Sequence, residues 1–510
     1  MVTQLRIKDG KKWVLKGKIV IDSNGRLVKG KSEKWELVGY TGRKPKGKLV
    51  ILEGMTEIGL EAFKGCTGLT SIEIPSSVTE IGWSAFNGCS HLQEIHVDEN
   101  NCVYSSKNGL LLNKEGITLL RVPASLTSVV IPAGVTEIGC HAFSHCTGLT
   151  SVEISSSVTE ICRNAFEDCT GLTSLEIPSS VTRIGEDAFC GCTGLTSVTI
   201  PSSVTEIGHH AFCECTGLTS IEIPSSVTEI DRNVFSDCTG LKSIKIPSSV
   251  TRIGLGAFKG CTGLTTIELP SSVTEIGAGA FEGCTGLKSV VIPAGVTEIG
   301  GSAFLGCTGL KSVVIPAGVT EIDAGTFKGC TGLKSIKIPS SVTKIGGLSF
   351  EGCTGLKSIE LPSCVTEIDA GTFKGCTGLK SVVIPAGVTK IGGWSFRNCT
   401  GLTSVVIPAG VTEIGWEAFK GCTGLTSIEI PSSVTRIVVE ALSGCTGLKS
   451  LTILSSEITI GEDAFKGCTQ LKTVNLPEGL QKDNILSTKS AFEEEDDDED
   501  WFSEDEDEDF

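Results

Sequence analysis

The sequence has few of the residues on which most acid–base and metal chemistry depends. Its 510 residues include only 6 His, 2 Tyr and 2 Met, and aromatic residues make up 5% of the chain. Scarce His and Tyr exclude most general acid–base and metal sites, and scarce Met excludes an adaptable Met-lined groove. The formal net charge of −17 argues against a general nucleic-acid binder, which needs a dominant basic surface.

Long apolar runs are also absent. The longest apolar run in the first 30 residues is Ile19-Val20-Ile21, which is too short for the core of a signal peptide. No stretch of 18 apolar residues occurs that could cross a membrane as a helix. From the sequence itself we therefore expect a protein without a membrane span that stays in the cytoplasm.

The dominant feature is a repeat of 23 residues. Cys66 and Cys89 are 23 residues apart, and a cysteine then recurs at this interval from Cys146 to Cys468, so that 17 of the 23 cysteines share one phase. The unit reads C-T-G-L-T/K-S-I-x-I-P-S-S-V-T-E-I-G-x-x-A-F-x-G, as in residues 261–283. A fixed period of 20–29 residues with this Leu and Ile spacing predicts a leucine-rich-repeat solenoid.

One unit can be interpreted residue by residue. In residues 287–292 strand alternation points Leu287, Val290 and Ile292 inward and Lys288, Ser289 and Val291 outward. Pro293 ends the strand, residues 296–299 supply a second extended stretch, Gly300 allows a sharp corner, and Phe304 returns to the core. We therefore expect a β-rich, right-handed coil with a parallel sheet on one face, each rung burying its apolar side against its neighbours.

The Ile-Pro phase gives about 19 rungs, with one irregularity. Val97 and Ile131 are 34 residues apart instead of 23. Two apolar runs flank Asn113-Lys114-Glu115-Gly116 in this interval, so we expect an inserted β-hairpin over about residues 98–123.

These motifs carry a specific resemblance. The repeat phrase, together with the Y-x-S-x-N-G-L-L-x-N-K-x-G-x-T-L-L-x-x-P segment that begins at Tyr104, resembles the BspA-like leucine-rich repeat family over about residues 48–480. The resemblance implies a surface antigen or adhesin that binds host or matrix proteins, and hence a cell-surface or secreted location.

The two ends differ from the repeats. Residues 1–48 carry 14 Lys or Arg and 4 Asp or Glu, with the turn dipeptides Asp9-Gly10 and Asn24-Gly25. We expect residues 1–47 to form a basic β-hairpin cap on the first rung, and residues 48–486 to form the solenoid. Residues 493–510 carry 14 Asp or Glu and no Lys or Arg, so an acidic tail over 487–510 is expected to be disordered.

The cysteines are expected to form a column of buried free thiols, which favours a reducing compartment. Two groups have residue types that zinc would accept, although their spacing matches no zinc motif: Cys190, Cys192, His209, His210, Cys213 and Cys215, and Cys140, His141, His145 and Cys146. We expect neither a metal site nor another cofactor. The Ser and Thr residues follow the repeat, and no phosphate-binding glycine loop occurs, so no enzymatic activity is expected.

The outward strand positions vary most and are the candidate binding residues. One phase holds Lys in five successive rungs, and exposed valines lie three positions further on in some of them. The set is Lys288, Lys311, Lys334, Lys357 and Lys380, with Val291, Val314 and Val383. Trp394 and Trp416 occupy neighbouring corners, where they either contact a partner or cover their own rungs. The lysine phase also fits recent duplication of a few units.

Two functions follow from these observations. The first is a monomeric, non-enzymatic solenoid that binds other proteins, adhesin-like by resemblance. The alternative is an intracellular interaction scaffold that uses the basic cap, a concave lysine stripe and the acidic tail, with acidic protein segments as partners.

Overall fold

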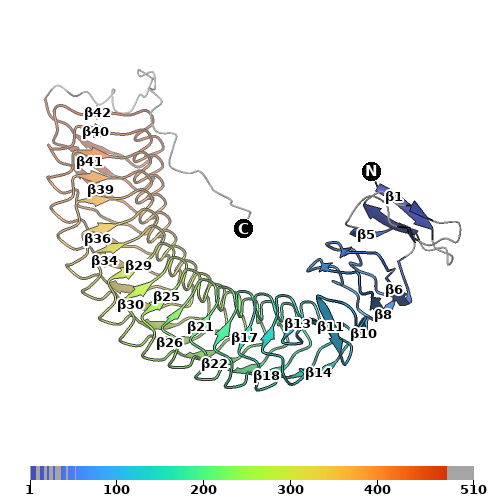
Figure 1. Ribbon diagram of the computed structural model, residues 1–510. Helices are drawn as coiled ribbons and strands as arrows, with labels where there is room; N and C mark the ends of the chain where they lie inside the picture. The colour runs from blue at the N-terminus through green and yellow to red at the C-terminus, as the bar shows by residue number, and fades with distance from the viewer. Residues whose placement is uncertain are drawn as a thin grey trace.

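The computed structural model describes residues 44–51, 53–478 and 480, and before them the backbone of five strands within residues 2–41. The chain winds into an arc of stacked coils, which we call rungs (Figure 1). There are about 19 rungs, and no helix occurs in the described part of the chain, so none there could cross a membrane. The solenoid predicted from the 23-residue period is confirmed. The acidic tail expected over 487–510 lies outside the described residues.

Each rung contributes first to a ladder of parallel strands with the exposed–buried–exposed pattern that the sequence predicts. A proline or a polar turn follows each strand and removes or redirects the next backbone donor. We call this the long-strand ladder. It consists of β6 (Gly47–Val50), β8 (Leu69–Ile74), β10 (Glu94–Val97), β14 (Ser128–Val130), β16 (Ser151–Glu153), β18 (Ser174–Glu176), β20 (Ser197–Thr199), β22 (Ser220–Glu222), β24 (Ser243–Lys245), β26 (Thr266–Glu268), β28 (Ser289–Val291), β30 (Ser312–Val314), β32 (Ser335–Lys337), β34 (Ser358–Glu360), β36 (Ser381–Val383), β39 (Ser427–Ile430), β41 (Ser450–Ile453) and β43 (Thr473–Asn475).

The Val-Thr-Glu-Ile stretch forms a second ladder, in which the isoleucine points inward. We call it the short-strand ladder, since most of its strands have two residues. It consists of β7 (Glu57–Ile58), β9 (Glu80–Ile81), β13 (Thr118–Arg121), β15 (Glu137–Ile138), β17 (Glu160–Ile161), β19 (Arg183–Ile184), β21 (Glu206–Ile207), β23 (Glu229–Ile230), β25 (Arg252–Ile253), β27 (Glu275–Ile276), β29 (Glu298–Ile299), β31 (Glu321–Ile322), β33 (Lys344–Ile345), β35 (Glu367–Ile368), β37 (Lys390–Ile391), β38 (Glu413–Ile414), β40 (Arg436–Ile437) and β42 (Thr459–Ile460).

A turn-rich segment between the second strand and the next cysteine closes each rung, and we call it the corner. Its phenylalanine is fully buried and stacks on the phenylalanines of the adjacent rungs. The ring centroids of Phe281 lie 5.4 Å from Phe258 and 5.3 Å from Phe304, with rings nearly parallel. This stack runs from Phe143 to Phe419 and supplies the largest side chains of the core.

The phased cysteines belong to the same contact. The Cys284 thiol donates to the Phe258 carbonyl of the preceding rung at 3.1 Å, and Cys307 donates to Phe281 in the same way. All cysteines in the described part of the chain are free, so the predicted column of buried thiols is confirmed. Burial raises the pKa of the Cys284 thiol to about 12, which keeps it protonated as a donor.

Close packing of backbones explains two of the repeat's glycines. A Cβ on Gly300 would lie 2.5 Å from the Ala278 nitrogen, and one on Gly286 would lie 2.3 Å from the Thr262 carbonyl oxygen. The sequence predicts that Gly300 allows a sharp corner. In the structure its lack of a Cβ also permits the close approach of the neighbouring rung.

The inserted segment forms two hairpins. β12 (Leu110–Asn113) pairs antiparallel with β13, as the Asn113–Gly116 turn predicts, and β13 then joins the parallel short-strand ladder beside β15. The additional hairpin pairs β11 (Tyr104–Lys107) with β12. Its turn residues Asn108 and Gly109 both have positive φ, so the Asn-Gly dipeptide was the signal for it.

N-terminal strands extend the short-strand ladder. β1 (Val2–Arg6), β2 (Lys12–Lys16) and β5 (Glu36–Thr41) are antiparallel neighbours, and β5 pairs in parallel with β7. A separate pair joins β3 (Val20–Ile21) to β4 (Leu27–Val28). The strands on either side of each predicted turn thus pair with each other, while Asp9-Gly10 and Asn24-Gly25 themselves lie outside the described residues.

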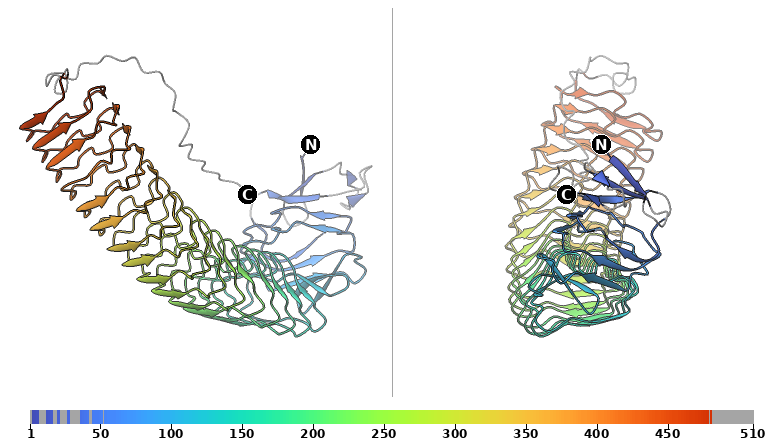
Figure 2. Two further views of the ribbon diagram at one scale, coloured as in Figure 1. Left: turned by 90° about the vertical axis from the view of Figure 1, so that its left-hand side faces the viewer. Right: turned by 45° about the vertical axis from the view of Figure 1, so that its right-hand side comes forward.

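The long-strand ladder lies on the outer, convex side of the arc, outside the short-strand ladder (Figures 1 and 2). Hydrogen bonding is consistent with this placement. From β14 to β36 the long strands pair only two by two, whereas up to five successive short strands join in one sheet. The rungs spread apart on the side of the long strands and remain paired on the side of the short strands. This difference produces the curvature.

Because the phenylalanine rings stack, removal of one ring should destabilise the rungs around it. Phe281→Ala removes a fully buried ring, and we expect the free energy of local opening to fall by about 3–5 kcal/mol. Hydrogen exchange of the amides in β27 and β29 would measure this loss. Val291→Ala, at a side chain 74% exposed in the adjoining rung, is the control and should change it by less than about 0.5 kcal/mol. Equal effects would contradict the role of the stack.

Candidate functional site

The five predicted lysines form one continuous line on the long-strand ladder. Each is exposed, just before its strand. Backbone bonds confirm the neighbouring positions, since Lys311 N donates to the Lys288 carbonyl, Lys334 N to Lys311 and Lys380 N to Lys357. We expected this stripe on the concave face. It lies on the convex face, because the rungs spread on the side of the long strands.

The stripe is not neutralised by its own chain. None of the five lysines forms an ion pair with any residue that the structure describes. On the short-strand ladder, by contrast, five exposed cations each pair with a glutamate one rung away: Arg183, Arg252, Lys344, Lys390 and Arg436. Arg183, for example, contacts Glu160 at 3.1 Å and Glu206 at 3.2 Å. Like charges side by side on neighbouring strands are destabilising, and the stripe retains unbalanced positive charge in five successive rungs.

The exposed valines lie beside this stripe in two separate pairs. Val291 and Val314 occupy adjacent rungs, but Lys337 and Glu360 then interrupt the row. Val383 is next to Val406, which was not among the predicted binding residues. These four side chains are 60–78% exposed. The surface is therefore a lysine line flanked by two small apolar patches.

The two tryptophans meet at the corners, on a different part of the rung from the lysines. Their ring centroids are 4.6 Å apart, and Trp394 N donates to the Trp416 carbonyl. Trp416 is 43% exposed, while Trp394 is half-buried with its Nε1 in the interior. Trp394 therefore covers its own corner, and Trp416 alone presents a substantial exposed face.

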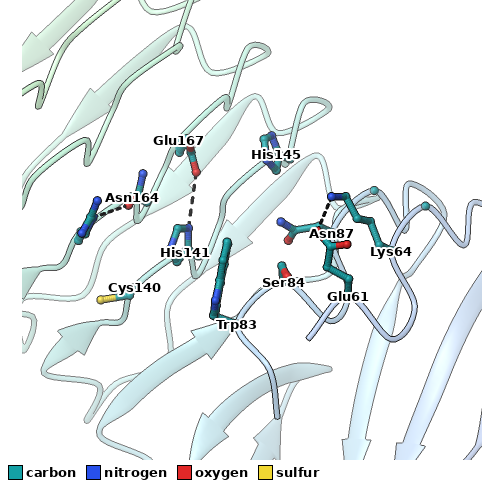
Figure 3. A pocket seen from close by; sticks show the side chains of 13 residues that line it. Glu61, Lys64, Trp83, Ser84, Asn87, Cys140, His141, His145, Asn164 and Glu167 are labelled. Atoms are coloured by element: carbon teal, nitrogen blue, oxygen red, sulfur yellow. Dashed lines mark hydrogen bonds and ion pairs between the residues drawn. The ribbon is translucent and has the colours of Figure 1, made fainter. Parts of the chain in front are cut away.

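A pocket that the sequence did not suggest lies near the insertion. It has a volume of about 980 Å³ and is lined by corner residues from both sides of the inserted hairpins. The indole of Trp83 stacks on the His141 ring at 4.7 Å (Figure 3). The available signal was the irregular spacing between Val97 and Ile131, which we assigned to a hairpin alone.

Comparison with known proteins identifies the repeat. The sequence model described as "BspA type Leucine rich repeat region (6 copies)" matches residues 45–111, 121–242, 239–357, 298–423 and 394–494. The chain belongs to this family. Repeats of the BspA type serve as protein-interaction scaffolds, and no enzyme family is indicated.

The chain is also similar to several solved structures. A leucine-rich repeat protein from Bacteroides ovatus is 30% identical, with 82% of this chain and 94% of that chain covered and a TM-score of 0.54. A leucine-rich repeat protein from Eubacterium ventriosum is 32% identical over 46% and 64% of the chains, with a TM-score of 0.43. A leucine-rich cell surface protein from Faecalibacterium prausnitzii is 26% identical over 96% and 99%, with a TM-score of 0.33. No curated protein sequence matches the chain.

The Cys and His residues considered for zinc are distributed over separate contacts in this BspA-type solenoid. Among the described residues, no three His, Cys, Asp or Glu side chains form a metal-binding group. His209 contacts Asp231 at 3.2 Å, His145 contacts Asp168 at 3.0 Å, and the Cys192 and Cys215 thiols donate to phenylalanine carbonyls in the buried column.

Cys190, Cys213 and His210 do come together. Hydrogen bonds from Cys190 and from His210 lower the pKa of the Cys213 thiol to about 6, although its burial opposes the shift. The same contact raises the pKa of His210. The chemistry that this arrangement supports is a stabilised thiolate rather than a metal site.

This thiolate can be tested by titration. We expect the thiolate absorbance of the parent chain at 240 nm to rise in a step with a midpoint near pH 6, well below the ordinary cysteine pKa of about 8.5. Cys213→Ser should remove this step. His210→Ala should move that midpoint to higher pH, because the imidazolium no longer stabilises the anion. Cys364→Ser, which removes an exposed thiol elsewhere, should leave the step unchanged. A midpoint above pH 8 in the parent chain would contradict the assignment.

Proposed function

We propose that the protein binds an acidic segment of another protein through the lysine stripe on its convex face. The observation that carries the proposal is the lack of any ion pair between these five lysines and the described residues, in a chain whose short-strand cations are paired. Unbalanced positive charge in successive rungs costs stability within the chain. A partner with matching carboxylates would offset that cost and gain both attraction and orientation.

The valine patches add apolar contact to this electrostatic surface. Val291 with Val314, and Val383 with Val406, would be covered by apolar side chains of the partner on either side of the central lysines. Desolvated apolar anchors contribute most of the affinity of a protein interface, while exposed charges contribute mainly to encounter and specificity. A partner segment that combines acidic and apolar residues therefore fits this surface best.

We further propose, from the family resemblance, that the partner is met at the cell surface, in the manner of an adhesin or surface antigen. The alternative is an interaction scaffold inside the cell, in which the basic cap and acidic tail also contribute. The free thiols in the described part of the chain favour this second candidate. Surface labelling of intact cells decides between the two, since only the first candidate exposes its lysines to an impermeant amine reagent.

The stripe is tested by charge removal. A synthetic peptide with the sequence of residues 493–509, which contains 14 acidic residues, serves as the acidic probe. We expect the full-length chain to bind it at low salt and to release it as salt rises, because exposed charges are screened over about 10 Å at 0.1 M. Replacing all five stripe lysines with Thr should weaken binding at least tenfold, as measured by calorimetry.

A matched variant controls for net charge. Replacing Lys245, Lys259, Lys328, Lys344 and Lys390 with Thr removes the same charge from lysines that pair with glutamates, and binding should weaken far less. The stripe variant should fold normally, because Thr occupies the same phase at Thr265 and Thr403. Equal probe affinity of the stripe variant and the parent at low salt would overturn the proposal.

A further inference from the structure

The rung after the inserted hairpins has a shortened corner. β13 pairs with β15 so that Leu119 lies opposite Ile138, and β14 pairs with β16 in the normal register. Ten residues, 139–148, connect Ile138 to Leu149, but only six, 120–125, connect Leu119 to Leu126. The corner of this rung is thus four residues shorter than that of the next rung.

On the side of the following rung, the short corner itself compensates for the missing residues. The guanidinium of Arg121 donates to the carbonyls of His141 at 2.7 Å and Ser144 at 3.1 Å, and Val122 N donates to Ala142 O at 2.8 Å. Arg121 is almost fully buried. The short corner therefore satisfies the carbonyl groups on its C-terminal side.

The preceding rung is not compensated in this way. In an intact corner the third and seventh residues donate to the next rung, as His141 N does to Arg163 O and His145 N to Glu167 O. The equivalent residues before the short corner are Ser84 and Gly88, and their N–H groups have no partner among the residues that the structure describes. Unpaired backbone donors of this kind normally find a partner.

Two side chains on the same wall have unused hydrogen-bonding atoms. Ser84 and Asn87 are more than nine-tenths buried, and neither Ser84 Oγ nor Asn87 Oδ1 has a partner. Both residues line the pocket, together with Gly88 and Trp83. The Trp83 side chain is 61% exposed beside the ring of His141 (Figure 3). The wall thus offers backbone donors, a hydroxyl, an amide oxygen and an aromatic surface.

We propose that this pocket binds a short peptide segment that takes the place of the missing part of the corner. Its carbonyl groups would accept hydrogen bonds from Ser84 N and Gly88 N, and one of its N–H groups would donate to Asn87 Oδ1. An apolar side chain of the segment would pack on Trp83. A peptide backbone supplies both carbonyls and N–H groups at the spacing of a corner, which is how added strands complete an open sheet edge.

Charge within the pocket favours an uncharged segment. Lys64 pairs with Glu61 at 2.5 Å, His145 with Asp168 at 3.0 Å, and His141 lies 3.5 Å from Glu167. The imidazole of His141 lowers the pKa of Glu167, which keeps this carboxylate charged. Because these ionisable groups face one another, the site presents little net charge and is distinct from the lysine stripe in both position and chemistry.

The chain itself supplies a suitable probe. A capped synthetic peptide with the sequence of residues 299–306, Ile-Gly-Gly-Ser-Ala-Phe-Leu-Gly, reproduces an intact corner and carries no charge. Calorimetry should give one peptide per full-length chain, and Trp83→Ala should weaken binding at least tenfold. Trp416→Ala, which removes an exposed tryptophan at an intact corner, should leave the affinity unchanged within twofold.

A graft tests the geometry directly. Replacing residues 120–125 with the ten-residue sequence of 139–148 restores a full corner and should abolish peptide binding while strand-rich circular dichroism is retained. Should this variant not fold, the comparison of Trp83→Ala with Trp416→Ala decides alone. The proposal is wrong if the peptide does not bind the parent chain, if the folded graft binds it equally, or if Trp83→Ala has no effect. Binding of a neutral oligosaccharide such as maltotriose in place of the peptide would equally overturn it.

Discussion

The contact between adjacent corners is the constraint on which the rest of the solenoid depends. Three interactions occur there together: phenylalanine rings stack about 5 Å apart, most of the phased cysteine thiols donate to the phenylalanine carbonyl of the preceding rung, and glycines let the backbones approach closely. Each of them requires one residue type at one phase. Because a rung contacts only its neighbours, the same requirement recurs in every rung, and this explains why Cys, Gly and Phe are so regular.

The place where this contact fails is also where the molecule has its pocket. The described hydrophobic core divides into two clusters at the insertion. The N-terminal cluster ends at Leu111, and the C-terminal cluster begins at Leu110. In the short corner, Val122 N donates to the Ala142 carbonyl, and in the next rung Phe143 N donates to the Ala165 carbonyl in the same way. Val122 therefore occupies the position that a phenylalanine fills in the next rung, with a smaller side chain. A buried arginine then replaces backbone donors at a cost in desolvation, which lowers the pKa of Arg121.

The sequence predicts the fold because the 23-residue period and strand alternation are both local signals. Leu287, Val290 and Ile292 point inward as expected, and the hairpin at Asn113–Gly116 is present. The direction of curvature was not predictable in this way, since it depends on small differences in spacing between the two ladders, summed over many rungs. The pocket was missed for a related reason. Its residues, such as Trp83 and His141, are separated by 58 positions and meet only because four residues are missing from the corner between them.

The two ladders show why the lysine stripe is more than a product of repetition. Both ladders are built from the same duplicated unit, and both place exposed charged residues one strand spacing apart. On the short-strand ladder, cations such as Arg252 and Lys390 alternate with glutamates and contact them. Each copied unit contributes to both ladders. Duplication alone therefore does not explain why cations are paired with glutamates on the short-strand ladder but not in the stripe. Five like charges occur together on one ladder, while the exposed cations of the other contact glutamates, and the long strands also expose valines beside the stripe. A surface that costs the isolated chain stability in both charge and apolar exposure is best explained by what it gains when a partner covers it.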